Sequence, residues 1–292
     1  RAAEGSDGIF RVTINGGVLV EGQRAEAVEF DDVSGELRWS DTGVPIEFVS
    51  GRIGGMLEAR DDYIAGLIDE LDAFAGTLIE QVNLIHASGL QLDWATSLTG
   101  GYQVTSATAL LSDISSSGLP LAVSAGQLTV VANGPGGETE TVISVASLET
   151  TASLAAKLDA LAGISASVED GRLVVTADSG YGFKIGLDTS GALSALGLGT
   201  LFLGEDAATV EVNSLLAESP GLLCTGRNGD PGDASVMNAL AGLESSRVAT
   251  GGYTLEEALE GLTSELGAAT KHATDLAESR DSVISLLYER RY

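Results

Sequence analysis

The sequence predicts an α+β protein in which a discontinuous rod domain of long helices, with small β elements, carries an inserted β-rich domain. Three observations predict this fold. Two amphipathic helical patterns of matching length lie at residues 52–87 and 254–290, and short strand-like segments rich in Thr, Ser and Gly lie between them. The apolar residues of the second helix also repeat with a period like that of a coiled coil. The predicted domains are residues 1–94, the first part of the rod, residues 95–217, the inserted outer domain, and residues 218–292, the second part of the rod.

Short alternating runs near the amino terminus predict strands. Residues 10–20 read FRVTINGGVLV, and Asn15-Gly16-Gly17 interrupts the alternation with residues that accept positive φ, which predicts a hairpin. Further strand candidates lie at residues 27–30, 36–39 and 44–49.

Residues 52–87 carry the first long helical pattern, whose apolar residues step mainly by three and four and so lie along one stripe. Acidic side chains occupy much of the remaining surface, which is typical of a helix with one buried face. Gly89 is placed to end the helix. The residues expected to pack along this stripe include Leu57, Ile64, Leu71 and Leu78.

The middle of the chain, from residue 95 onward, predicts an α+β module of many short strands. A helix is predicted over residues 151–161, and Asp170-Gly171 predicts a tight turn between two strands. The strand candidates are residues 101–106, 119–123, 127–132, 140–145, 164–169, 172–177, 183–187 and 208–213.

After the loop GRNGDPGD a helix is predicted over residues 235–245, and the last helix runs over residues 254–290. Thr254 and Glu257 form a capping box at its start. Its apolar positions alternate by four and three, and we expect this stripe to pack on the stripe of the first helix. The predicted seam residues of this helix are Leu259, Leu266, Ala273, Val283 and Leu287.

The charge balance excludes several partners. Fifteen Lys and Arg against 42 Asp and Glu give a net charge of -27, which repels nucleic acid and anionic lipid surfaces alike. No stretch is long and apolar enough to predict a membrane span. The single cysteine, Cys224, excludes an intrachain disulfide and a cysteine-based zinc site.

No catalytic, cofactor-binding or metal-binding residue is predicted. Asn228, Asp230 and Asp233 could offer oxygen ligands to calcium, but the later bidentate Glu of an EF-hand is missing, so a solvated loop is the better interpretation. Carboxylate pairs such as Asp61-Asp62 lie on polar helix faces rather than in a pocket that separates two pKa values. We expect His86 to cap or pack at its helix end and Cys224 to be a small semi-buried residue.

Three patterns follow one another in SGRIGGMLEARDDYIAGLIDELDAFAGTLIEQVNLIHASGLQLD, residues 50–93: Gly-Gly-x-Leu-x-x-Arg-Asp, then Leu-Asp-x-Phe-Ala, then Val-Asn-x-x-His-x-x-Gly. This segment resembles the family of flagellar hook-associated protein 1, the hook-filament junction protein. Two further segments, residues 188–213 and ESRDSVISLLYERR near the carboxyl terminus, are similar to sequences of the same family. The residues that carry the main resemblance are Gly54, Gly55, Leu57, Arg60, Asp61, Leu71, Asp72, Val82, Asn83, His86 and Gly89.

The resemblance implies a structural, non-enzymatic subunit of the bacterial flagellum. Such a subunit is exported through the flagellar type III apparatus, is extracellular, and forms a ring that joins hook to filament. Its implied partners are the hook protein, the second junction protein and copies of itself. The resemblance also implies that the chain is a core fragment, monomeric alone, whose polymerisation segments would precede Arg1 and follow Tyr292.

Two alternatives remain open at this point. The acidic, Thr-rich residues 95–217 could form an outward-facing adhesin that binds glycans or protein. The chain could also be another flagellar axial protein: the second junction protein, the hook, a flagellin-like subunit or the filament cap.

Overall fold

The structure, a computed structural model, describes residues 2–4, 6, 8–14, 16–47 and 51–290, except for the side chain of Leu287. The chain divides into two compact units, Arg1–Asp69 and Glu70–Tyr292, which are described here one at a time. The predicted domain boundaries after residues 94 and 217 stay a prediction.

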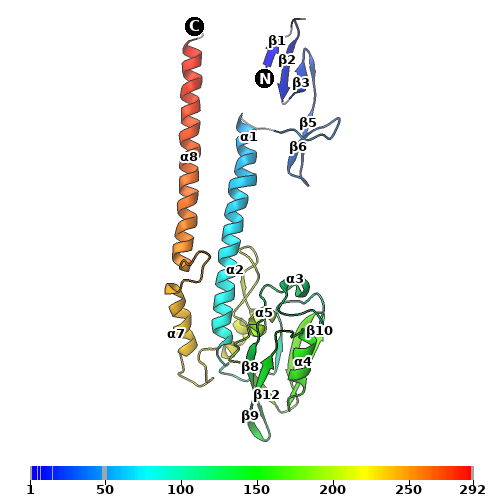
Figure 1. Cartoon of the computed structure of the whole chain (residues 1–292), viewed down its shortest axis with the longest axis vertical. Helices are drawn as coiled ribbons and strands as arrows, with labels where there is room; N and C mark the ends of the chain where they lie inside the picture. Colours follow the sequence, from blue (N-terminus) through cyan, green and yellow to red (C-terminus); the bar gives the residue numbers. More distant parts are fainter. Residues whose placement is uncertain (1, 5, 7, 15, 48–50, 291–292) are drawn as a thin grey trace. The chain divides into compact units, whose positions relative to one another are not determined.

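Unit 1 begins with an antiparallel sheet of four short strands in the order β1-β2-β3-β4 (Figure 1). The predicted hairpin is confirmed, because Ile14 pairs with Gly17 and Gly16 adopts a φ of 85° in the turn; Asn15 lies outside the described residues. The strands are β1 (Ala2–Glu4), β2 (Phe10–Ile14), β3 (Gly17–Glu21) and β4 (Arg24–Ala25).

A second hairpin of unit 1 pairs β5 (Val28–Asp31) with β6 (Glu36–Trp39), close to the predicted bounds. For the strand predicted at residues 44–49, the structure gives a single bridge between Arg38 and Pro45, while residues 48 and 49 lie outside the described part. Asp31 holds the turn of this hairpin, because its Oδ1 accepts hydrogen bonds from the Val33 and Ser34 amides.

The first long helix is confirmed, but it is not one regular α-helix. It consists of α1 (Gly51–Glu58), a π-helical segment η1 (Ala59–Ile64) and α2 (Ala65–Ala87). The seven-residue step between Leu57 and Ile64 in the apolar pattern spans this π segment. A π turn takes in an extra residue, so it changes the spacing at which residues return to one face.

Unit 2 contains two three-stranded antiparallel sheets. One has the order β12-β8-β9 and the other the order β10-β11-β7. Residues 95–99 connect the two sheets, since Ala95 pairs with Phe183 of β12 and the next residues form β7 beside β11. The strands are β7 (Ser97–Thr99), β8 (Gly126–Gly134), β9 (Gly137–Val145), β10 (Ile164–Glu169), β11 (Arg172–Ala177) and β12 (Gly182–Gly186).

The core of unit 2 lies between these sheets and the helix α4 (Thr151–Asp159), which packs on β10 and β11. Its largest buried side chains come from both sheets and from α4, among them Phe183, Leu128, Leu173 and Leu154. The predicted turn at Asp170-Gly171 is confirmed, because both residues have positive φ and the flanking Glu169 and Arg172 pair.

Two predicted strands of the module are wrong and a third is much shorter. In residues 101–106, the amides of Gly101 and Tyr102 bond to the end of α5 (Ala192–Leu196) and that of Val104 bonds to Gly171, so no ladder forms. Residues 119–123 are irregular because their apolar side chains fill the core without a strand partner. Within residues 208–213 only β14 (Glu211–Val212) pairs, with β13 (Phe202–Leu203).

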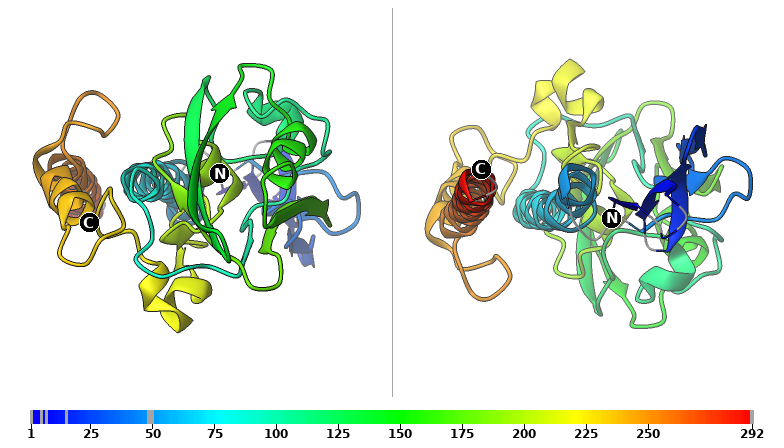
Figure 2. Two further views of the ribbon diagram at one scale, coloured as in Figure 1. Left: turned by 90° about the horizontal axis from the view of Figure 1, so that it is seen from below. Right: turned by 90° about the horizontal axis from the view of Figure 1, so that it is seen from above.

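The remaining elements of unit 2 are mostly helical. Figure 2 shows the strands of the unit on one side of α2 and the helices α7 and α8 on the other side. The capping box of α8 is confirmed, with Thr254 and Glu257 exchanging side-chain to backbone hydrogen bonds of 2.9 and 3.1 Å. The elements are α3 (Ile114–Ser117), α5 (Ala192–Leu196), α6 (Ser214–Glu218), η2 (Pro220–Leu222), α7 (Ser235–Gly242), η3 (Leu243–Ser245) and α8 (Leu255–Glu289).

Candidate functional site

The carboxyl end of α2 buries two polar side chains, Asn83 and His86, which are 2% and 0% exposed. The Asn83 amide makes two hydrogen bonds to one backbone unit: its Nδ2 donates to the Phe202 carbonyl at 2.9 Å, and its Oδ1 accepts from the Phe202 amide at 3.0 Å. Because both groups of the amide are satisfied, its burial carries little desolvation penalty. Asn83 therefore fixes β13 to α2 across 119 residues of sequence.

His86 connects the same helix end to a second distant segment. Its Nε2 accepts a hydrogen bond from the backbone amide of Cys224 at 3.0 Å. Burial lowers the pKa of the His86 imidazole to about 4, so the ring is neutral at physiological pH. Since Nε2 accepts, the proton of the neutral ring lies on Nδ1.

Gly89 lets the chain pass closely between two other segments directly after the helix. The Leu90 amide donates to the Gly226 carbonyl on one side, and the Leu187 amide donates to the Gly89 carbonyl on the other. A Cβ at position 89 would lie 2.6 Å from Cγ2 of Val236 and 2.7 Å from the Gly226 carbonyl oxygen. Only glycine fits here without a shift of the surrounding backbone.

The third sequence pattern therefore serves packing. The expectation that His86 packs at the helix end is confirmed by its burial and its bond to Cys224. Cys224 itself is 2% exposed, so it is more deeply buried than the semi-buried residue expected, and burial raises the pKa of its thiol to about 12. Asn83, His86 and Gly89 together join α2 to three segments that lie far along the chain.

The first sequence pattern lies in unit 1 and involves η1. Gly54 is buried in α1, and the Arg60 guanidinium forms an ion pair of 2.5 Å with Asp61 on the π turn. The Arg60 guanidinium also lies 5.9 Å from the ring centre of Phe30, so it joins the helix to the β5–β6 hairpin. The hydrogen bond with Asp61 raises the pKa of Arg60, and the same bond lowers the pKa of Asp61.

Most of the predicted seam residues lie on exposed helix surface. Leu57 and Leu78 are half-buried, whereas Ile64, Leu71 and Ala273 are exposed and Leu259, Leu266 and Val283 are 45%, 50% and 54% exposed. The side chain of Leu287 lies outside the described residues. Packing along the whole seam stays a prediction.

Within unit 2, α2 and α8 meet over a short length. Leu262, one of the residues in the four-three alternation of α8, is only 8% exposed. A groove of about 600 Å³ remains between the helices, and Ala73 and Phe74 of α2 line it together with Ala258 and Gly261 of α8. The small residues Ala73, Ala258 and Gly261 let the helices approach without filling the space between them.

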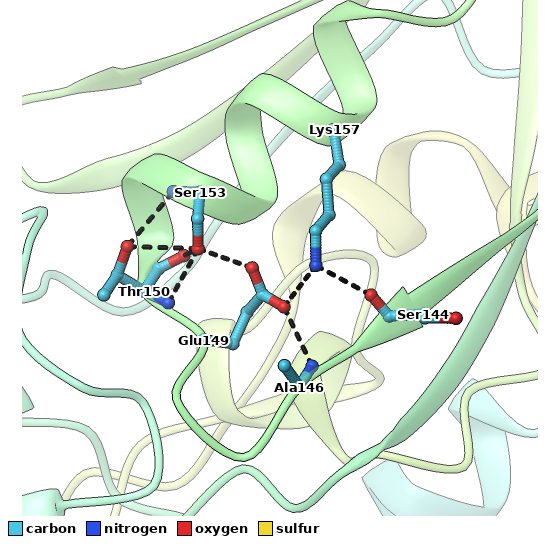
Figure 3. A network of polar contacts seen from close by, with 6 residues as sticks. All are labelled: Ser144, Ala146, Glu149, Thr150, Ser153 and Lys157. Carbon is cyan, nitrogen blue, oxygen red and sulfur yellow. Dashed lines mark hydrogen bonds and ion pairs between the residues drawn. The ribbon is translucent and has the colours of Figure 1, made fainter.

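A buried carboxylate in the module was missed from the sequence. The Glu149 carboxylate accepts hydrogen bonds from the Ala146 amide at 2.9 Å and from the Lys157 ammonium and the Ser153 hydroxyl at 2.5 Å each (Figure 3). Burial alone would raise the pKa of this carboxyl, but the bonds from Ala146, Lys157 and Ser153 outweigh burial and lower it. The signal available was Thr150-x-x-Ser153, which forms a capping box at the start of α4.

One of the acidic residues considered for chemistry, Asp233, organises a turn. Asp233 accepts hydrogen bonds from the amides of Arg227, Asn228 and Ser235, and so organises the loop that was weighed as a calcium site. Across the described residues, no group of three or more His, Cys, Asp or Glu side chains is placed to hold a metal ion. The same part of the chain contains no helix with the length and apolar character of a membrane span.

Long helices with exposed apolar residues, and sequence patterns that serve packing, are typical of structural proteins that form assemblies. In the comparison with protein families, residues 1–100 match the model of the helical domain of the flagellar hook-associated protein FlgK. This match covers 100 of the 292 residues and confirms the resemblance drawn from residues 50–93. No curated protein sequence matches the chain.

Proposed function

We propose that the protein is the subunit that joins the flagellar hook to the filament, with the hook protein, the second junction protein and its own copies as partners. The family match over residues 1–100 carries this proposal, since it assigns the chain to a structural, hook-associated part of the flagellum. The proposed location is the extracellular flagellum.

The surface of α8 supports a role in assembly. Leu259, Leu266, Leu276 and Val283 recur at its seam positions and are each about half exposed. Beyond Leu276 the apolar side chains no longer keep to one stripe, because Ile284, Leu286 and Tyr288 are exposed on other faces of the helix. A helix that is apolar on several faces is usually covered on several sides, here by neighbouring subunits.

Hydrogen bonds at the base of the module support the proposal of a rod with an inserted domain. The chain enters the module after α2 at Asp93, whose amide donates to the Gly221 carbonyl at 2.7 Å. Leu90 and Gly226 form a further bridge directly beside this bond. The segments by which the chain enters and leaves the module thus lie side by side, as expected for an insertion into a helical rod.

The test is substitution of the seam in the full-length gene, expressed in a strain that lacks its own copy. Leu259→Asp, Leu266→Asp and Val283→Asp together should abolish swimming and release filaments into the medium, because buried carboxylates would oppose packing. The matched control adds the same charge to the opposite face of α8, away from the exposed apolar residues beyond Leu276, through Ser264→Asp, Ala268→Asp and Thr274→Asp, and should swim.

Two results would contradict the proposal. Normal swimming and attached filaments in the seam variant would show that the seam has no role in assembly. Immunogold labelling of the wild-type protein along the filament or at its tip, instead of at the hook-filament boundary, would assign the chain to another axial position.

A further inference from the structure

Unit 2 has an open cleft of about 430 Å³ at the end of a sheet, where β8 ends and β12 begins. Figure 1 labels both strands. Two aromatic side chains line it: Trp94, which follows α2, and Tyr181, which precedes β12. Asn133, Thr96 and Pro135 supply the other side chains, and three glycines supply the remaining lining. The cleft is therefore built from three segments that are distant in sequence.

Both aromatic rings are held in place. A Cβ at Gly134 or at Gly163 would lie 2.1 Å from the Tyr181 ring, so both glycines leave room for its edge. Lys184 lies 4.7 Å from the ring centre of Trp94, and its ammonium also donates to the Gly229 carbonyl at 3.1 Å. Rings fixed in this way lose little conformational freedom when a ligand stacks on them.

The polar groups around the cleft are available to a ligand. The side chains of Asn133, Thr96, Trp94 and Tyr181 line the cleft and are not fully buried, and none of them forms a hydrogen bond within the described part of the chain. In a protein of net charge -27, no charged side chain lines this cleft within the described residues. The lining thus suits a neutral ligand that has both an apolar face and hydroxyl groups.

We propose that this cleft binds a neutral saccharide, with the apolar face of a sugar ring against Trp94 or Tyr181 and its hydroxyls bonded to Asn133 and Thr96. A proline-rich peptide is the other ligand class that aromatic grooves accept. Proline lacks an N–H donor, however, and would leave the acceptor oxygens of Asn133 and Thr96 unused. The observations therefore favour a sugar, and the binding goes beyond the proposed junction role.

The two tryptophans of the chain make a direct test possible, since Trp94 lies in the cleft and Trp39 lies in β6 of unit 1. In the ¹⁵N-labelled protein, the two indole N–H signals are followed during titration with maltohexaose, cellohexaose and chitohexaose to about 10 mM, a range suited to a weak, open site. The proposal expects the Trp94 signal to shift and saturate with at least one saccharide while the Trp39 signal stays fixed.

Variants then test the placement of the ligand. Asn133→Ala should raise the dissociation constant by about tenfold, read from the Trp94 signal, because it removes the amide that bonds the sugar hydroxyls. Asn228→Ala, on an exposed loop outside the lining, should leave the constant unchanged. The proposal is overturned if the Trp94 signal ignores all three saccharides, if it responds only to a decaproline peptide, or if Asn133→Ala binds as well as wild type.

Discussion

Burial of a neutral His86 predicts that unit 2 loses stability when the pH falls from 7 to 5. The pKa of His86 is about 4 in the folded protein, against an ordinary value of 6.5. Between these two values the unfolded chain binds the proton and the folded chain does not, so protonation favours unfolding. The stability linked to His86 is therefore complete above pH 6.5 and is lost as the pH falls toward 4.

The magnitude follows from the two pKa values. With 1.36 kcal/mol for each unit of separation, the loss of unfolding free energy between pH 7 and pH 5 is about 2 kcal/mol. Few carboxylates titrate in this window, because unperturbed Asp and Glu side chains have pKa values of about 4. The expected loss is thus separable from acid effects on the many carboxylates of the chain.

The assay is urea unfolding at several pH values, followed by the fluorescence of Trp94 in a Trp39→Phe background, so that the signal reports unit 2. His86→Gln can still accept the hydrogen bond from Cys224 but does not titrate, and should remove most of the pH dependence between pH 7 and pH 5. His272→Gln is the matched control, because His272 is exposed on α8, and this variant should keep the pH dependence of the wild type. Equal pH slopes in wild type and His86→Gln would refute the reasoning.

Three further predictions concern named groups. Glu149→Gln should lower the free energy of unfolding by about 1–3 kcal/mol at pH 7. Because the pKa of Glu149 is lowered in the folded protein, the difference in unfolding free energy between variant and wild type should shrink as the pH falls below 4.5, the ordinary pKa of the group. Urea unfolding at several pH values measures this, and a difference that does not change with pH would contradict it. Gly89→Ala should destabilise by about 1–3 kcal/mol through overpacking, whereas Gly267→Ala, with open space around it in α8, should stabilise by about 0.5–1 kcal/mol in the same assay. The Cys224 thiol should react with Ellman's reagent only after urea unfolding, and fast labelling of the folded protein would show that it is not enclosed.

Local signals were enough to place several of the regular elements. The capping box at Thr254 and Glu257 set the start of α8, and Asp170-Gly171 set the turn between β10 and β11, because in both cases neighbouring residues satisfy the backbone. The strands expected at residues 101–106 and 119–123 failed for the opposite reason. Their backbone amides form hydrogen bonds with distant segments that the neighbouring sequence does not predict, such as the end of α5 and the turn at Gly171.

The candidate site could be named from the sequence but not explained by it. The family resemblance singled out Asn83, His86 and Gly89, yet their partners Phe202, Cys224 and Gly226 lie more than 100 residues away. No local pattern relates such pairs, since they meet only when the chain returns from the module. Glu149 was missed for a related reason, because an acidic residue before a helix predicts an exposed cap rather than a buried carboxylate.

The exposed seam of α8 is too small to hold two subunits together by itself. Burying a large apolar side chain completely is worth about 1.5–3 kcal/mol, and Leu259, Leu266, Leu276 and Val283 each have about half of their surface left to bury. The four together offer about 4 kcal/mol, which only equals the lower bound of about 4–15 kcal/mol that association costs. A stable contact therefore requires further surfaces, such as the apolar side chains on the other faces of α8, and so a subunit held by several neighbours at once.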